Sequence, residues 1–355
     1  MKAVIMAGGG GTRLFPISRK CMPKQFLGID RESSLLEETI RRCRSFANEE
    51  DILVVTNERY RQHVENELAA AEANGASLVL EPVARNTAPA VALAAKFAKD
   101  KLGAEDEEVI FVSTSDHIIR PVETFKAAVG LAAKVAEKGK FVTFGVRPTY
   151  PETGFGYIEL GGESGGAYKT VSFKEKPDID TAKYYLKQGN YLWNSGMFAF
   201  RLGDFFRELS EYAPEIYRLT LGNYEEMASA FVNMPDISID YAVAEHTKAG
   251  VTLPLPCYWN DVGSWDAIYD VLEKDEYGNA LKGDVISVDS KRNLVYGKKR
   301  LIATVGLEDV LVVETDDVIL VAGRGQSQKV KELVAELKEK GRVETEIFTE
   351  EAHGE

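Results

Sequence analysis

Short runs of apolar and β-branched residues alternate along the first part of the chain with longer segments in which apolar residues recur every three to four positions. The short runs predict strands at residues 3–6, 52–56, 77–80 and 109–113. The longer segments predict helices at residues 59–72, 88–102 and 124–137. Strands that alternate with helices in this way predict an α/β domain built on a mostly parallel sheet.

The pattern becomes mixed from residue 141 to about residue 270. Strands are predicted at residues 141–146, 156–160 and 169–173, and helices at residues 181–187 and 203–209. We interpret this mixed region as an extension of the first domain. We therefore expect one domain over residues 1–275, with a mixed, mostly parallel sheet.

After about residue 277 the predicted strands become short and turn-separated. They fall at residues 284–289, 293–296, 301–305, 310–314 and 317–321, about eight residues apart. This spacing predicts a small β module over residues 276–340, for which a short left-handed β-helix is one arrangement. Apolar residues at helical spacing then predict an amphipathic helix over 326–340, which packs on its own domain or forms a dimer contact. Residues 341–355 predict a polar tail.

Four consecutive glycines, Gly8, Gly9, Gly10 and Gly11, follow directly after the first predicted strand. Glycines lack Cβ atoms, so their backbone N–H groups can approach and surround an anion. A P-loop would place Lys-Ser or Lys-Thr after the run, and neither follows it. A dinucleotide loop would open a helix, which Pro16 argues against. The run therefore predicts a polyphosphate site of another kind.

Charge and cysteine content narrow the classes of ligand and of compartment. The formal net charge of −13 excludes nonspecific nucleic-acid binding. Residues 1–44 nevertheless carry nine Lys or Arg against four Asp or Glu, which favours a small phosphorylated ligand beside the glycines. Three cysteines without metal-binding spacing indicate a reducing, cytoplasmic setting. No apolar run reaches the length of about 18 residues that a membrane span needs.

Three acidic residues lie where strands or turns end. Asp116 follows the fourth predicted strand and is a ligand for Mg²⁺ or a turn residue. Asp261 lies just before Gly263 and is a second carboxylate or an N-cap turn. Glu81 follows the third strand, in the segment EPVARNTAPA, which resembles the base-binding loop of guanylyltransferases. The resemblance implies that its carboxylate binds guanine, whose N1–H and N2–H₂ groups both donate hydrogen bonds. The neighbouring Asn86 assists it or caps the following helix.

These residues belong to motifs that resemble the sugar-nucleotide pyrophosphorylases. The N-terminal motif reads GGGGTRLFPISRKCMPKQF, and its PKQF ending resembles the mannose-1-phosphate guanylyltransferase branch. Other motifs follow in the family's order, and they read EPVARNTAPA, FKEKP, WNSGMF, SIDY and YWNDVGSW. The resemblance covers about residues 1–275 densely, and it implies a Rossmann-like nucleotidyltransferase domain there.

The resemblance also implies roles for individual residues. The catalytic residues are Arg13, Lys24, Asp116 and Asp261, of which the two aspartates hold Mg²⁺. The residues that bind the nucleotide are Gly8, Gly9, Gly10, Gly11, Thr12, Glu81, Arg85, Asn86, Thr87 and Ser115. The residues that bind the sugar phosphate are Gly154, Glu175, Lys176, Asn194 and Asp240.

The implied reaction transfers GMP from GTP to mannose 1-phosphate and releases pyrophosphate and GDP-mannose. No covalent intermediate with the protein is expected, because positioning and charge stabilisation suffice for nucleotidyl transfer. Two alternatives remain: a pyrophosphorylase that uses UTP or dTTP with glucose 1-phosphate, and a noncatalytic regulatory subunit that binds a sugar nucleotide. We expect no nucleic acid and no membrane as partners, and a homodimer formed through the C-terminal region.

Overall fold

The computed structural model describes residues 1–9 and 12–348. The chain divides into two compact units. The first unit comprises Met1–Gly8, Glu37–Ser115 and Ile119–Trp259, and the second comprises Gly9–Leu36, Asp116–Ile118 and Asn260–Glu355. Each unit is thus assembled from segments that lie far apart in the sequence. The domain boundary expected at residue 275 stays a prediction.

A nine-stranded mixed sheet forms the centre of the first unit. In spatial order its strands are β3 (Ser77–Glu81), β2 (Ile52–Asn57), β1 (Lys2–Met6), β4 (Val109–Thr114), β9 (Tyr191–Arg201), β6 (Phe141–Val146), β10 (Gly250–Pro254), β8 (Ala167–Lys174) and β7 (Tyr157–Ser164). Strands β3, β2, β1 and β4 are parallel, whereas β9 is antiparallel to both β4 and β6. The carboxyl ends of the four parallel strands therefore meet at one edge, where ligands bind in such sheets.

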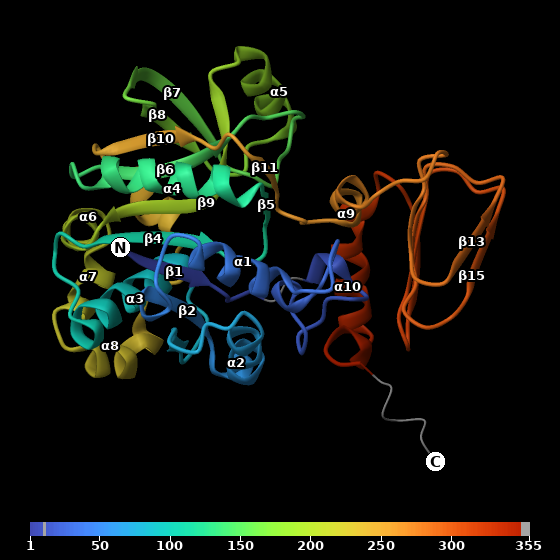
Figure 1. The fold of residues 1–355 in the computed structure, drawn as a ribbon, viewed down its shortest axis with the longest axis horizontal. Helices are drawn as coiled ribbons and strands as arrows, with labels where there is room; N and C mark the ends of the chain where they lie inside the picture. The colour runs from blue at the N-terminus through green and yellow to red at the C-terminus, as the bar shows by residue number, and fades with distance from the viewer. Residues whose placement is uncertain (10–11, 349–355) are drawn as a thin grey trace. The chain divides into compact units, whose positions relative to one another are not determined.

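Helices cover both faces of this sheet (Figure 1). Because side chains alternate along a strand, Ile110 and Val112 of β4 join the core that contains α3 (Thr87–Leu102). Phe111 points the other way and contacts Phe125 of α4 (Val122–Ala136), with ring centroids 6.0 Å apart. The remaining helices of this region are α1 (Leu35–Arg44), α2 (Arg61–Ala70), α5 (Ile179–Gln188), α6 (Leu202–Tyr212), α7 (Pro214–Thr220) and α8 (Tyr224–Ala230).

The second unit contains two small, mostly parallel sheets. One contains β12 (Ala280–Lys282), β14 (Leu294–Tyr296), β16 (Val310–Glu314) and β17 (Ile319–Gly323), and the other contains β13 (Val285–Val288) and β15 (Ile302–Val305). Val285 pairs with Ile302 and Leu294 with Leu311, 17 residues further along in each case. Successive coils therefore stack, and the buried Asn293 side chain donates to Asn279 Oδ1 of the preceding coil at 3.2 Å. The predicted β module is confirmed, while its left-handedness stays a prediction.

The segment that follows the glycine run is part of the core of the second unit. Leu14 and Phe15 are buried with Trp265 of α9 (Trp265–Val271) and with Val330 and Val334 of α10 (Val330–Glu339). The Trp265 indole donates to the Phe15 carbonyl at 2.9 Å. The predicted amphipathic helix thus packs on its own unit, beside the short 3₁₀ helix Thr12–Leu14.

Several short elements escaped prediction from the sequence. Strand β5 (Ile118–Arg120) pairs with β11 (Tyr258–Asn260), and residues Asp240–Ala244 form a π-helical turn. Over residues 1–9 and 12–348, no helix is long and apolar enough to cross a bilayer.

Candidate active site

Gly8 and Glu81 meet at the carboxyl edge of the first unit's sheet. Gly8 follows β1, and Glu81 is the last residue of β3. A Cβ atom at Gly8 would lie 3.2 Å from Glu81 Oε2, so a larger residue there would cover the carboxyl. Gly9 adopts a φ of +120°, which favours glycine. Gly10, Gly11 and the side chain of Thr12 lie outside the described residues.

The Glu81 carboxyl is buried, and the described residues offer its side chain no hydrogen-bond donor. It is 6% exposed, and none of the residues that the structure describes donates to its side chain. Burial raises the pKa of Glu81 to about 7, because the charged form loses its hydration. A buried carboxyl in this state is stabilised by a ligand that brings its own donors.

The loop between β3 and α3 is held by a hydrogen bond within it and by bonds to two residues far along the chain. Asn86 caps α3, since its side chain accepts from the Thr87 N–H at 2.9 Å. Thr87 Oγ1 accepts from Ile239 N at 2.9 Å, and Arg85 donates to the Val232 carbonyl at 2.6 Å. These contacts bear out the capping interpretation, and nucleotide contacts by the three residues stay predictions. The nucleotide contact of Ser115 also stays a prediction. Ser115 is buried, and its carbonyl accepts a hydrogen bond from the Thr39 hydroxyl at 3.3 Å.

The four predicted catalytic residues come together in the second unit. The Lys24 ammonium is 2.8 Å from Asp116 Oδ2 and 2.5 Å from the main-chain oxygen of Asp261. A Cβ atom at Gly263 would overlap the Asp261 carboxylate and lie 3.2 Å from Arg13 Nη1, which puts the guanidinium beside the same turn. Two cations and two carboxylates therefore share one small region, although they come from three separate segments of the chain.

The cations keep the Asp116 carboxyl ionised. Burial alone would raise its pKa, but Lys24, His117 and Arg13 outweigh burial, so that the pKa of Asp116 lies below its usual range. His117 Nε2 lies 3.5 Å from Asp116 Oδ1. An ionised carboxylate at this place suits a hard divalent cation.

Local backbone geometry directs the Asp261 carboxylate. Its Oδ1 atom accepts from the Gly263 N–H at 3.0 Å, and Asn260 Oδ1 accepts from the Val262 N–H at 2.7 Å. The buried Val262 has a φ of +48°, a strained conformation for a β-branched residue and one that is common at functional sites. The N-cap of α9 is Ser264, which accepts from Ala267 N at 3.2 Å. Asp261 is therefore not the capping residue.

The predicted sugar residues cluster in the first unit. Asn194 Nδ2 donates to Asp240 Oδ1 at 2.7 Å, and Asn194 N donates to the Gly156 carbonyl at 2.8 Å. The Glu175 Oε2 atom is buried without a partner in the described part of the chain. A Cβ atom at Gly156 would overlap that oxygen, so glycine leaves room for the carboxylate in this position. The Lys176 ammonium is exposed and lies 3.1 Å from Glu175 Oε1.

The two carboxyl groups of this cluster influence each other. Burial and, after it, the nearby Glu175 together raise the pKa of Asp240 to about 6, against the hydrogen bond from Asn194. Gly154 donates its N–H to Glu152 Oε1 at 2.7 Å, which shapes the loop before β7. Buried acceptors held this way match the hydroxyl groups of a sugar. Gly156 was not among the predicted sugar residues. Its position directly before β7 is a signal that could have identified it.

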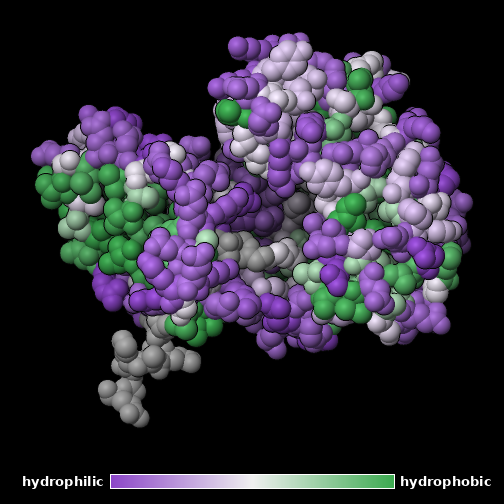
Figure 2. All heavy atoms as spheres, turned by 180° about the vertical axis from the view of Figure 1, so that it is seen from behind, coloured by the Kyte–Doolittle hydropathy of each residue, from purple (hydrophilic) through white to green (hydrophobic). Residues whose placement is uncertain are grey.

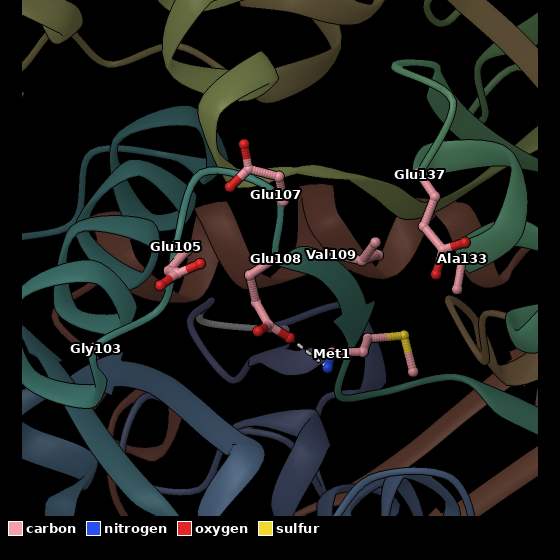
Figure 3. Close-up of a pocket in the computed structure, with 8 residues that line it drawn as sticks. All are labelled: Met1, Gly103, Glu105, Glu107, Glu108, Val109, Ala133 and Glu137. Atoms are coloured by element: carbon pink, nitrogen blue, oxygen red, sulfur yellow. Dashed lines mark ion pairs between the residues drawn. The ribbon is translucent and has the colours of Figure 1, made fainter.

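A separate acidic pocket lies at the opposite edge of the same sheet (Figure 3). It is lined by Glu105, Glu107, Glu108 and Glu137, and the Met1 amino group pairs with Glu108. Met1 precedes β1 and Glu108 precedes β4, so the pocket faces the amino ends of these strands. Its like charges disfavour a phosphorylated ligand.

Known proteins resemble this chain over most of its length. The nucleotidyl transferase family model matches residues 2–278, and the MannoseP isomerase/GMP-like beta-helix domain matches residues 283–337. The chain is 42% identical over 352 residues to mannose-1-phosphate guanylyltransferase RfbM of Salmonella typhimurium, with 96% of this chain and 73% of the relative covered. It is 46% identical over 351 residues to xanthan biosynthesis protein XanB of Xanthomonas campestris pv. campestris, with 96% and 74% covered.

A solved structure extends the similarity to the whole fold. The crystal structure of a Thermus thermophilus protein, described as a mannose-1-phosphate geranyltransferase, has a TM-score of 0.86 and 33% sequence identity to this chain. It covers 95% of this chain and 99% of that protein. Both the catalytic fold and the C-terminal module are thus matched. The chain therefore belongs to the nucleotidyl transferase family, in which it groups with the mannose-1-phosphate guanylyltransferases.

Proposed function

We propose that the protein transfers GMP from GTP to α-D-mannose 1-phosphate and releases pyrophosphate and GDP-mannose. The names of its relatives support the reaction class and the sugar phosphate. The observation that carries the choice of base is the carboxyl of Glu81, which is buried beside Gly8 and accepts no hydrogen bond from the part of the chain that the structure describes.

Guanine is the base that best satisfies this carboxyl. Its N1–H and N2–H₂ groups donate side by side, so both oxygens of Glu81 accept at once. Uracil and thymine present a single N–H on the corresponding edge, and adenine presents one donor group beside an acceptor. With these bases the buried carboxylate would keep an unsatisfied oxygen, which is costly. Guanine donors also favour the ionised form of a group whose pKa is about 7.

The cluster around Lys24 suits the phosphates of GTP and one divalent ion. Asp116 and Asp261 offer carboxylate oxygens, and within the described ranges no group of three or more His, Cys, Asp or Glu could hold a metal. The remaining positions would fall to phosphate oxygens and water, which is the arrangement typical of Mg²⁺ with nucleotides. When bound there, Mg²⁺ would neutralise phosphate charge and align the two phosphates.

The reaction step needs no nucleophilic side chain. A phosphate oxygen of mannose 1-phosphate attacks the α-phosphorus of GTP in line, and the bond from this phosphorus to the bridging oxygen breaks. Pyrophosphate leaves with the electron pair. Arg13 and the glycine N–H groups hold the β- and γ-phosphates and stabilise the charge that develops on them, while Lys24 neutralises the transferring phosphoryl group.

The sugar cluster of the first unit provides the second substrate's binding groups. Glu175, Asp240 and Asn194 accept or share hydrogen bonds with hydroxyl groups, and Lys176 holds the 1-phosphate. The unpaired Glu175 oxygen supports this role, because a hydroxyl donor would satisfy it. Gly154 gives the sugar close access to the backbone.

The test is pyrophosphate release with Mg²⁺, in which GTP, ATP, UTP and dTTP are each combined with mannose 1-phosphate and glucose 1-phosphate. We expect strong preference for GTP with mannose 1-phosphate. Preference for UTP or dTTP would refute the guanine argument but leave the chemistry intact. No release with any pair, from folded protein that binds a sugar nucleotide, would favour a regulatory subunit.

We also propose a homodimer formed through the outer face of β13 and β15. Ile286, Val288 and Val305 are 56%, 49% and 70% exposed, and Val288 pairs with Val305 across the two strands. Figure 2 shows hydrophobic side chains gathered over this module. Such a face is costly in water, and a second copy would cover it symmetrically. In sedimentation, Val305→Lys should yield monomers, whereas the control Val232→Lys, on the first unit, should not; a parent that sediments as a monomer would refute the dimer.

We propose a cytoplasmic location as well. In the described part of the chain Cys21, Cys43 and Cys257 form no disulfide, and Cys43 is buried. Free thiols of this kind persist in a reducing compartment. The thiol count of protein extracted under alkylating conditions would test this, because a disulfide would lower it.

A further inference from the structure

The last described residues of the chain hold the loop between Arg13 and Lys24. Cys21 N donates to the Glu346 carbonyl at 3.0 Å, and Arg19 Nη1 donates to the Ile347 carbonyl at 2.6 Å. The Lys20 ammonium also lies 2.8 Å from the Glu346 carboxylate, although both groups are exposed. Residues 342–348, expected as part of a polar tail, are therefore docked on this loop, which we call the phosphate loop (residues 13–24).

Arg19 connects this segment to the β module. Its side chain is fully buried and donates twice to Asp317, at 2.5 and 2.6 Å, once to Thr315 at 3.3 Å and once to the Pro16 carbonyl at 3.0 Å. The centroid of the Phe348 ring lies 4.0 Å from the guanidinium carbon of Arg19. With the bond to the segment's carbonyl, all five guanidinium N–H groups have acceptors. None is left for a substrate.

The position of Arg19 lets it set the geometry of both cations. On one side it fixes the Pro16 carbonyl, three residues after Arg13. On the other side Arg19 and Met22 exchange main-chain hydrogen bonds of 3.0 and 3.1 Å, which closes the turn that leads to Lys24. A buried arginine with five acceptors has one orientation, so the loop that carries it has one conformation.

We infer that residues 343–348 form a clasp that positions Arg13 and Lys24 by holding Arg19, which acts as a positioning residue for nucleotidyl transfer. The clasp acts on the phosphate loop of the second unit and not on the sugar cluster, which belongs to the first unit. This inference rests on the proposed function, because the effect of the clasp is measured as a change in kcat and in the KM for pyrophosphate.

The experiment compares a chain that ends at Arg342 with a matched control that ends at Phe348. The control loses only residues 349–355 and should behave like the full chain. In the shorter chain we expect kcat to fall by about 10- to 100-fold, as for a misplacement of catalytic groups by about 1 Å. In the reverse reaction the KM for pyrophosphate should rise by about fivefold or more, while the KM for GDP-mannose changes by less than about twofold. A purely structural role would lower the fraction of active protein and leave every KM unchanged.

Arg19→Lys, which keeps the charge but loses the forked geometry, provides a second variant that does not depend on truncation. We introduce Arg19→Lys both into the full chain and into the chain that ends at Arg342. The comparison tests whether the clasp acts through Arg19. We expect the combined variant to be no slower than the slower single variant, because the two changes disrupt one interaction. Multiplied effects would overturn the inference, as would an unchanged KM for pyrophosphate in both single variants.

The two proposals fail in different ways. A full-length protein that transfers no nucleotide would refute the proposed function. A full-length protein with this activity, whose Arg342-terminated form is equally active, would refute the clasp alone.

Discussion

The buried Glu81 carboxyl permits a prediction in which stability and activity change in opposite directions. The substitution Glu81→Gln keeps the size of the side chain and removes its ionisable proton. The pKa rises from 4.5 to about 7 on folding, which corresponds to about 3 kcal/mol against the ionised form. The unfolded chain releases this proton near pH 4.5, whereas the folded chain holds it until about pH 7. The free energy of unfolding that depends on Glu81 therefore falls as pH rises through this window and stays low above it.

Glu81→Gln should consequently be more stable than the parent at pH 8, by about 1–3 kcal/mol, and nearly equal to it at pH 4. Its activity should fall, because the glutamine amide places a donor against the guanine donors. We expect kcat/KM for GTP to drop by about 100-fold or more. The affinity of the parent for GTP should increase as pH rises through 7, and the variant should lack this dependence.

Urea unfolding at pH 4 and pH 8, together with initial rates against GTP, measures both effects. Glu314→Gln is the matched control. Burial would raise the pKa of Glu314, but hydrogen bonds from Lys298 N, Lys299 N and Arg300 outweigh it and hold the pKa below its usual range. This control should therefore lose stability at pH 8. If Glu81→Gln is destabilised at pH 8, or uses GTP as well as the parent does, the account of this carboxyl is refuted.

Three further predictions concern the other charged residues. Arg13→Ala should lower kcat, measured by pyrophosphate release, by about 10³-fold with little change in the KM for mannose 1-phosphate. An unchanged kcat would show that Arg13 takes no part in the reaction. Lys24→Met should bind Mn²⁺ more tightly than the parent without nucleotide, as followed by electron paramagnetic resonance, because an ammonium 2.8 Å from Asp116 repels a second cation. Equal Mn²⁺ affinity would contradict this. In the parent, kcat/KM for mannose 1-phosphate should fall as the pH drops through about 6, where Asp240 gains its proton. Asp240→Asn should abolish this pH dependence. A variant that keeps the pH dependence would show that another group titrates.

Most of the central sheet could be predicted because its signal is local. The strands expected at residues 52–56 and 77–80 correspond to β2 and β3, since buried parallel strands are continuous apolar runs. The helix expected over residues 88–102 was placed within one residue of α3, which the cap Asn86 begins. Short elements such as β5 and β11 carry little local signal, because three residues pair only where the tertiary structure brings them together.

The candidate site was predictable as a set of residues but not as an arrangement. The motifs supplied Lys24, Asp116 and Asp261, and the structure adds that a single ammonium contacts the other two. The strained φ of Val262 and the full set of partners around Arg19 depend on contacts distant in the sequence. Such contacts leave no pattern in the neighbouring residues, so sequence periodicity does not reveal them.

The hydrogen bonds of Arg19 have a consequence for the order in which the protein is built. Its partners Asp317 and Ile347 lie 298 and 328 residues further along the chain. During synthesis the loop that carries Arg19 therefore leaves the ribosome long before these two partners are translated. Until then its arginine has no buried acceptor, and contacts at such separation form late because loop closure is slow. The Arg19 side chain can therefore reach its five acceptors only once the chain has been translated as far as Ile347.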